Sequence, residues 1–182
     1  SHPFESNWYN NKNPIIAWDK DPNVSGFSYV LDNKPNTIPD NIVKTQETQT
    51  HLLNLDDGIW YFHIKSLKSG IWGSTTDFAI RIDSIEPASF VPTADITSDG
   101  KISRILINFN TTDSLSGIDH YEVGVINKDE SPNISPAFIQ VGSPYQLSNT
   151  PNKVFRIIVR AIDGAGNIRD ESIDIHASTS FI

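Results

Sequence analysis

Short apolar runs separated by turn-forming residues make up most of the chain. Many of the runs alternate apolar and polar positions. In residues 155–162, for example, Phe155, Ile157 and Val159 fall on one face. A period of two is typical of a β-strand that lays one face on a core. We therefore expect strands within 13–19, 26–32, 49–55, 59–67, 76–83, 103–110, 118–126, 136–142, 153–162 and 171–177.

The segments between these runs favour turns over helices. They are rich in Asp, Asn, Gly, Pro and Ser, as in LDDG (55–58) and DGAG (163–166), and these residues form tight turns. No stretch of ten or more residues has an apolar period of 3.6, and 11 prolines are spread along the chain, which disfavours long helices. Many short strands with turns between them predict an all-β sandwich.

An internal repeat divides the chain. WDKDPNVSGFSYVLD (18–32) and FNTTDSLSGIDHYEVGV (109–125) share an aromatic residue, an acidic stretch, Ser-Gly and a tyrosine-containing strand. Later in each copy, WYFHIKSLKSG (60–70) aligns with VFRIIVRAIDGAG (154–166). The repeat predicts two domains, 1–85 and 86–182. Pro87 in the short link favours a semi-rigid, end-to-end arrangement.

Composition narrows the classes of function. The net charge of −8 argues against nucleic acid and anionic lipid as partners. The chain has no cysteine, which excludes disulfides and thiolate metal sites. It also lacks methionine, so we expect it to be part of a longer or processed protein. No apolar run approaches the roughly 18 residues that cross a bilayer, so we expect no membrane insertion within this segment.

The pattern resembles the tandem fibronectin type III and immunoglobulin-like modules of bacterial and archaeal surface or secreted proteins. Trp18 sits where such modules bury a tryptophan, and Leu55 with Tyr61 in LDDGIWY resembles their Leu–Tyr corner. In the second half, SGIDHYEV followed by VRAIDGAGN has the form common in bacterial modules. The resemblance implies two consecutive seven-stranded sandwiches and an extracellular or cell-surface location.

Two positions depart from the family pattern. Phe155 stands where the corner tyrosine of the second module would be, so the corner hydrogen bond is not available there. The first module has KSGIW where the second has DGAGN, so it need not share that turn.

Aromatic residues concentrated in the first half are the candidate contact residues. All four tryptophans lie there, and Trp8, Tyr9, Trp60 and Trp72 could stack on sugar rings or anchor a protein interface. Trp60 and Tyr61 are neighbours in one strand, so if Tyr61 points inward, Trp60 points outward. The alternative is that these rings cover a sheet face or seal the junction between the domains.

Loop carboxylates are the candidate metal ligands. Asp19 and Asp21 occupy the same loop of the first copy as Asp113 and Asp119 do in the second. Calcium takes six to eight oxygen ligands, so calcium is the one cofactor considered. The alternative is that these side chains bond to their own turns, and no DxDxDG loop is present.

No catalytic constellation is present. The histidines lack metal-ligand spacing, the serines lack a GxSxG context, and no glycine-rich phosphate loop occurs. We expect a non-catalytic structural or adhesive module, acting as a stalk, spacer or filament-forming segment of a larger extracellular protein. Its partners would be neighbouring domains, other copies of the protein or a surface polysaccharide. The alternatives are a carbohydrate-binding accessory module and an appendage of a secreted enzyme.

Overall fold

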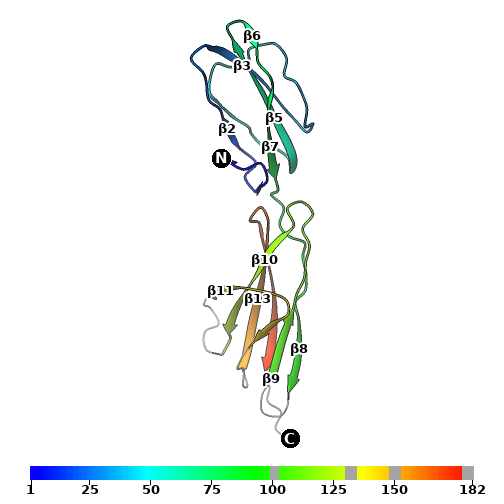
Figure 1. The fold of residues 1–182 in the computed structure, drawn as a ribbon. Helices are drawn as coiled ribbons and strands as arrows, with labels where there is room; N and C mark the ends of the chain where they lie inside the picture. Colours follow the sequence, from blue (N-terminus) through cyan, green and yellow to red (C-terminus); the bar gives the residue numbers. More distant parts are fainter. Residues whose placement is uncertain (99–102, 130–134, 148–152, 178–182) are drawn as a thin grey trace. The chain divides into compact units, whose positions relative to one another are not determined.

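The structure is a computed structural model that describes residues 1–98, 103–129, 135–147 and 153–177. These residues form β-strands and connecting segments, and the chain divides into two compact units, Ser1–Ile85 (unit 1) and Glu86–Ile182 (unit 2). Each unit is built from two facing sheets (Figure 1). Within the described residues, no helix is long and apolar enough to span a membrane.

Unit 1 has a larger and a smaller sheet. The larger has the order β1-β7-β5-β3, with β6 paired to β5, and the smaller pairs β2 with β4. β1 runs parallel to β7, and the other pairs of unit 1 are antiparallel. The strands are β1 (Trp8–Tyr9), β2 (Ile15–Ala17), β3 (Val24–Asp32), β4 (Gln49–His51), β5 (Gly58–Lys68), β6 (Ile71–Trp72) and β7 (Thr76–Ile82).

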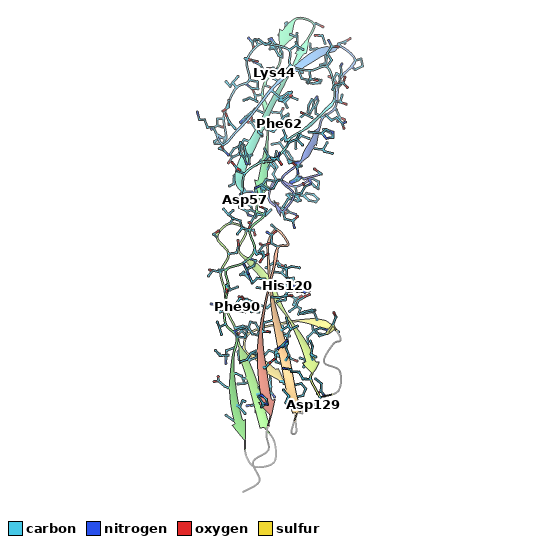
Figure 2. All side chains as sticks on the ribbon, turned by 180° about the vertical axis from the view of Figure 1, so that it is seen from behind. Lys44, Asp57, Phe62, Phe90, His120 and Asp129 are labelled. Carbon is cyan, nitrogen blue, oxygen red and sulfur yellow. The ribbon has the colours of Figure 1, made fainter. Side chains whose placement is uncertain are left out.

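Alternation along β5 builds the core of unit 1. Phe62 is buried in the core, and Trp60 and Ile64 pack against it from the same face of the strand. Trp18, directly after β2, packs on this core from the opposite sheet, with its ring centroid 5.7 Å from that of Phe62. Figure 2 shows Phe62 in the interior of the unit. The expectation that Trp18 packs on the core is confirmed.

The outward face of β5 lies under the segment 33–44. His63 is fully buried there, with Nδ1 2.6 Å from a carboxylate oxygen of Asp77 and Nε2 2.9 Å from the carbonyl oxygen of Lys34. The carboxylate of Asp40 accepts a hydrogen bond from Ser28 at 2.8 Å. Segment 33–44 therefore docks on the sheet through polar contacts, and the apolar core lies on the other side.

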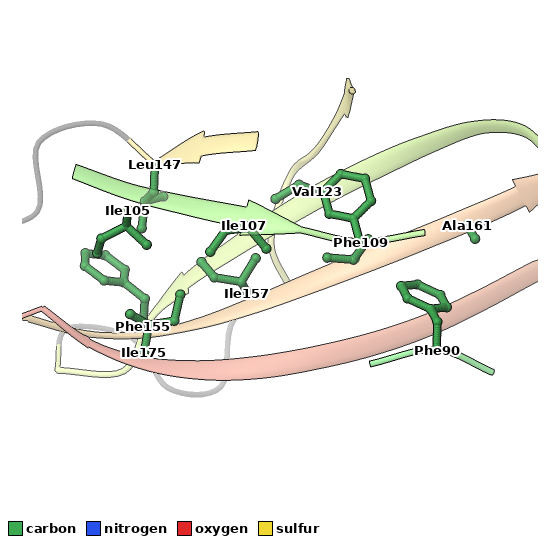
Figure 3. Close-up of a cluster of buried hydrophobic side chains, with 11 residues drawn as sticks. Phe90, Ile105, Ile107, Phe109, Val123, Leu147, Phe155, Ile157, Ala161 and Ile175 are labelled. Carbon is green, nitrogen blue, oxygen red and sulfur yellow. The ribbon is translucent and has the colours of Figure 1, made fainter. Parts of the chain in front are cut away.

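Unit 2 also contains two sheets. One has the order β11-β10-β13-β14 and the other β12-β9-β8, and all their pairs are antiparallel. Side chains from the two sheets meet between them and form the core (Figure 3). The strands are β8 (Thr93–Ser98), β9 (Ser103–Asn108), β10 (Ile118–Asn127), β11 (Phe138–Val141), β12 (Tyr145–Leu147), β13 (Lys153–Asp163) and β14 (Ile168–Ala177).

Each of the ten ranges expected from the sequence contains a strand, but four strands were not expected. β1 and β6 are two residues long, and a pair of residues carries no readable alternation. β12 has three residues and follows a Ser143–Pro144 turn with a cis peptide bond. β8 reads TADITS, which has few apolar positions, because it lies at the edge of its sheet.

A ladder of ion pairs covers the outer face of β13 and β14. Asp174 accepts hydrogen bonds from Arg156 at 2.9 and 3.2 Å and from Lys128 at 3.0 Å. Arg160 makes a two-pronged pair with Asp170. The hydrogen bonds from Arg156, and then from Lys128, hold the pKa of Asp174 far below its ordinary value of 3.8.

This depressed pKa predicts an acid-sensitive contribution to the stability of unit 2. A carboxylate whose pKa is lowered by folding stabilises the fold above its unfolded pKa, and the contribution is lost as the pH falls. We expect Asp174→Asn to be less stable than the original protein at pH 7, and the difference to shrink below about pH 4. Urea midpoints measured between pH 7 and pH 2 test this. Parallel curves for the two proteins would contradict it.

Candidate functional site

Trp60 lies on the core face of β5. It lies on the same face of β5 as Phe62, and its indole N–H donates to the carbonyl of Asp56 at 2.8 Å. Tyr61 lies on the opposite face, where its ring stacks against His63. The two neighbours face opposite sides of the strand, as expected, and Trp60 is the one on the core side. Leu55, the other half of the expected corner, is buried in the core.

Trp72 belongs to strand β6 instead of a turn. It pairs with Leu67 of β5, and the ammonium group of Lys65 lies 5.2 Å from the centre of its ring. The ring is partly buried. A cation over the ring face is an attractive contact, so Trp72 is engaged within its own unit.

Trp8 and Tyr9 join the N-terminal segment to the last strand of unit 1. Trp8 pairs with Arg81 of β7, and the Arg81 guanidinium lies 5.8 Å from the Trp8 ring centre. The Tyr9 carbonyl accepts a hydrogen bond from the Asp83 N–H at 3.0 Å. The Glu5 carboxylate accepts one from the Ala79 N–H, and the Glu5 carbonyl accepts one from Arg81 Nε, both at 2.9 Å.

Unit 2 repeats this arrangement. Arg169 on β14, its last strand, donates from Nε to the carbonyl of Pro87 at 3.1 Å and pairs with the Glu86 carboxylate at 3.1 Å. Ser89 donates to Glu171 of the same strand at 3.0 Å. In each unit, an arginine of the last strand thus holds a backbone carbonyl of the first segment. We call these contacts the terminal clasps, Glu5–Arg81 in unit 1 and Pro87–Arg169 in unit 2.

Among the described residues, no group of three possible metal ligands includes Asp19, Asp21 or Asp119. In unit 1, Asp19 and Asp21 are exposed, and Asp21 pairs with Lys68 at 3.1 Å. In unit 2, the Asp119 carboxylate lies 2.6 Å from Nδ1 of His120.

Asp113 is engaged by its own loop. One of its carboxylate oxygens accepts the N–H groups of Leu115, Ser116 and Gly117 at 2.9–3.0 Å. A carboxylate oxygen of Asp163 lies within 4.8 Å of an oxygen of Asp113, and Asp163 accepts the N–H groups of Ala165 and Asn167. These hydrogen bonds agree with the alternative that the loop carboxylates bond to their own turns. Calcium binding stays an untested prediction.

The structure reveals a groove that the sequence did not indicate, along one edge of unit 1 between β2 and β7. Two hollows of about 400 Å³ and about 280 Å³ are both lined by Trp18, Ile64 and Thr76. We call these two neighbouring hollows together the edge groove. The larger hollow is also lined by Ile16, Phe62, Asp77 and Phe78, and the smaller by Asp19, Asp21, Lys65, Ser66 and Ser74.

The edge groove exists because β1 pairs with β7 and leaves β2 with a single neighbour, β4. The sequence gives no sign of this, since a two-residue strand could pair with either edge. Beside this groove, the buried indole N–H of Trp18 has no hydrogen-bond partner among the described residues.

Comparison with known proteins supports the fold alone. No protein-family model matches the chain, and no curated protein matches it either. Among solved structures, the chain is similar to the FN1–FN3 domains of chicken CNTN1, at 17% identity with a TM-score of 0.52. It is also similar to domains A168–A170 of titin, at 13% identity with a TM-score of 0.58.

Both alignments include 94% of this chain, which spans 62% of the CNTN1 structure and 61% of the titin structure. At such low identity the likeness concerns the path of the backbone. The chain therefore has the fold of tandem fibronectin type III-like and immunoglobulin-like β-sandwich domains.

Proposed function

We propose that this chain is a non-catalytic, load-bearing spacer within a larger cell-surface or secreted protein. The observation that carries the proposal is the presence of a terminal clasp in both units. A spacer transmits force through the first and last segments of each domain. These are the segments that Arg81 and Arg169 join.

The geometry of unit 1 suits resistance to pulling. β1 and β7 are parallel, and they carry the two ends of the unit. Opposite forces on the two ends therefore slide one strand along the other, so that the bonds of the pair and of Glu5 share the load. In unit 2, the last strand, β14, also pairs with β13 along its whole length. The paired residues run from Ile162 opposite Ile168 to Lys153 opposite Ala177. The likeness to the FN domains of CNTN1 concerns the fold alone, and the spacer role rests on the clasps.

The clasps can be tested with Arg81→Gln and Arg169→Gln. A hydrogen bond to a charged group contributes about 1.5 kcal/mol, which corresponds to a roughly tenfold change in rate. We expect each substitution to raise the unfolding rate of its own unit about tenfold at constant force. Single-molecule force spectroscopy, with the chain held by its two ends, measures these rates.

Arg104→Gln is the matched control, since Arg104 is exposed on β9 and lies outside both clasps. It removes the same charge and should leave the unfolding rates unchanged. If Arg81→Gln and Arg169→Gln unfold under force as slowly as this control, the clasps bear no load and the proposal loses its support.

A further inference from the structure

We propose that the edge groove of unit 1 binds an extended peptide strand from a partner polypeptide. The strand would have apolar residues at alternate positions and a lysine or arginine near one end. This function goes beyond the spacer role and does not depend on it. The argument rests on the walls, the floor and the charge of the groove.

The β2 wall offers main-chain hydrogen-bonding groups. The main-chain N–H of Trp18 donates to the carbonyl of Thr48, and the carbonyl of Pro14 accepts from the N–H of Leu52. The main-chain groups of the even-numbered residues of this strand therefore face β4. Because these groups alternate along an antiparallel pair, the N–H and C=O of Ala17 face the free edge. Those of Ile15, which point the same way, are bonded to Ser1. Among the described residues, Ala17 therefore turns its main-chain groups to this edge without a hydrogen-bond partner, next to Ser1, which also lines the larger hollow.

The β7 wall has an equivalent position. The Ala79 N–H is bonded to Glu5 and the Asp83 N–H to Tyr9 on the edge away from β5. By the same alternation, the main-chain groups of Asp77 face that edge. Asp77 also lines the larger hollow. An extended peptide could pair with either wall through its backbone, as strands do when they add to a sheet edge.

The floor of the groove is apolar, with one polar group that lacks a partner. Ile16, Phe62 and Phe78 line the larger hollow, which suits side chains from alternate positions of a strand. The buried indole N–H of Trp18 lacks an acceptor among the described residues, and a buried unpaired donor is costly. A peptide carbonyl that enters the groove would supply the acceptor.

The carboxylates of the smaller hollow favour a basic side chain near one end of the peptide. Asp19 and Asp21 line it, and Asp21 is paired with Lys68. Within the part of the chain that the structure describes, the Asp19 carboxylate makes no ion pair or hydrogen bond. A basic side chain of the peptide would complement it.

The test uses two capped synthetic peptides, one with three Thr-Val repeats after an N-terminal lysine and one with the repeats before a C-terminal lysine. Each is titrated into the isotope-labelled protein up to 1 mM while amide shifts are followed. We expect saturable shifts at Ala17, Trp18 and Asp77 with one of the peptides. Asp19→Asn should weaken that binding two- to fivefold, as for an exposed ion pair, whereas Asp56→Asn, at another exposed aspartate of unit 1, should not.

Ala17→Pro removes the N–H at the free edge and should abolish binding. Proline is tolerated on edge strands, and the tryptophan fluorescence of unit 1 verifies that the variant is folded. The Asp19→Asn result stands even if the proline variant does not fold. The proposal is overturned if neither peptide shifts these amides at 1 mM, or if cellohexaose shifts them and the peptides do not.

Discussion

Replacing Phe62 with alanine should lower the free energy of unfolding of unit 1 by about 3–5 kcal/mol. Phe62 is 1% exposed, and its ring centroid lies 5.7 Å from that of Trp18 and 5.3 Å from that of Tyr29. The truncation removes a buried ring and leaves a cavity between two sheets that cannot close over it. For a domain of this size, such a loss lowers the melting temperature by roughly 20 °C.

Tryptophan fluorescence measures this effect selectively, because all four tryptophans belong to unit 1. Urea unfolding followed at the tryptophan emission should show the midpoint of Phe62→Ala at much lower urea. Phe4→Ala is the matched control, since Phe4 is 62% exposed and its loss should change the midpoint little. Equal midpoints for the two variants would show that Phe62 does not hold the sheets together.

A single methyl group at Gly164 should destabilise unit 2 by about 2–3 kcal/mol. A Cβ atom at this position would lie 2.7 Å from the carbonyl oxygen of Ser116, a backbone atom that cannot rotate away. The Gly164 N–H also donates to the carbonyl of Gly117 at 2.9 Å. Gly164→Ala therefore pushes the β13–β14 turn away from the loop 113–117, which adds a lost hydrogen bond to the overpacking strain.

Amide hydrogen exchange in β13 measures the stability of unit 2. Gly142→Ala is the control variant. A Cβ at Gly142 meets no atom within 4 Å, so this change should be neutral or slightly stabilising through the unfolded state. We expect Ile157 and Val159, both fully buried, to exchange 30- to 150-fold faster in Gly164→Ala. The same protection in both variants would mean that the turn has room for a side chain.

The fold was readable from the sequence where strands are long and half buried. β5 and β13 show clean alternation, and the fold class follows from ten such runs with turns between them. The pairing of β1 was not readable, because two residues carry no period and their partner lies far along the chain. That pairing decides which strand edge stays open, so the edge groove was equally invisible in the sequence.

The candidate site residues show a second limit of the sequence. Trp60 and Tyr61 must face opposite sides of their strand, but alternation does not say which side is the core. The resemblance to a Leu–Tyr corner did not settle the side, and the structure builds the core from Phe62 with Trp60 and Ile64. The other face of β5 is covered by segment 33–44, a long connection without a regular pattern, so the sequence did not indicate that His63 is buried there.

The parallel pairing of β1 with β7 also governs when unit 1 can be completed during synthesis. The Glu5–Ala79 bond joins residues 74 positions apart, and the Glu5–Arg81 bond joins residues 76 apart. Contacts of such long sequence separation form late, because a long loop must close first. A ribosome-bound chain that has not yet released β7 therefore holds its N-terminal segment unpaired. Until then, β3, β5 and β6 are the strands of this sheet that can pair with one another.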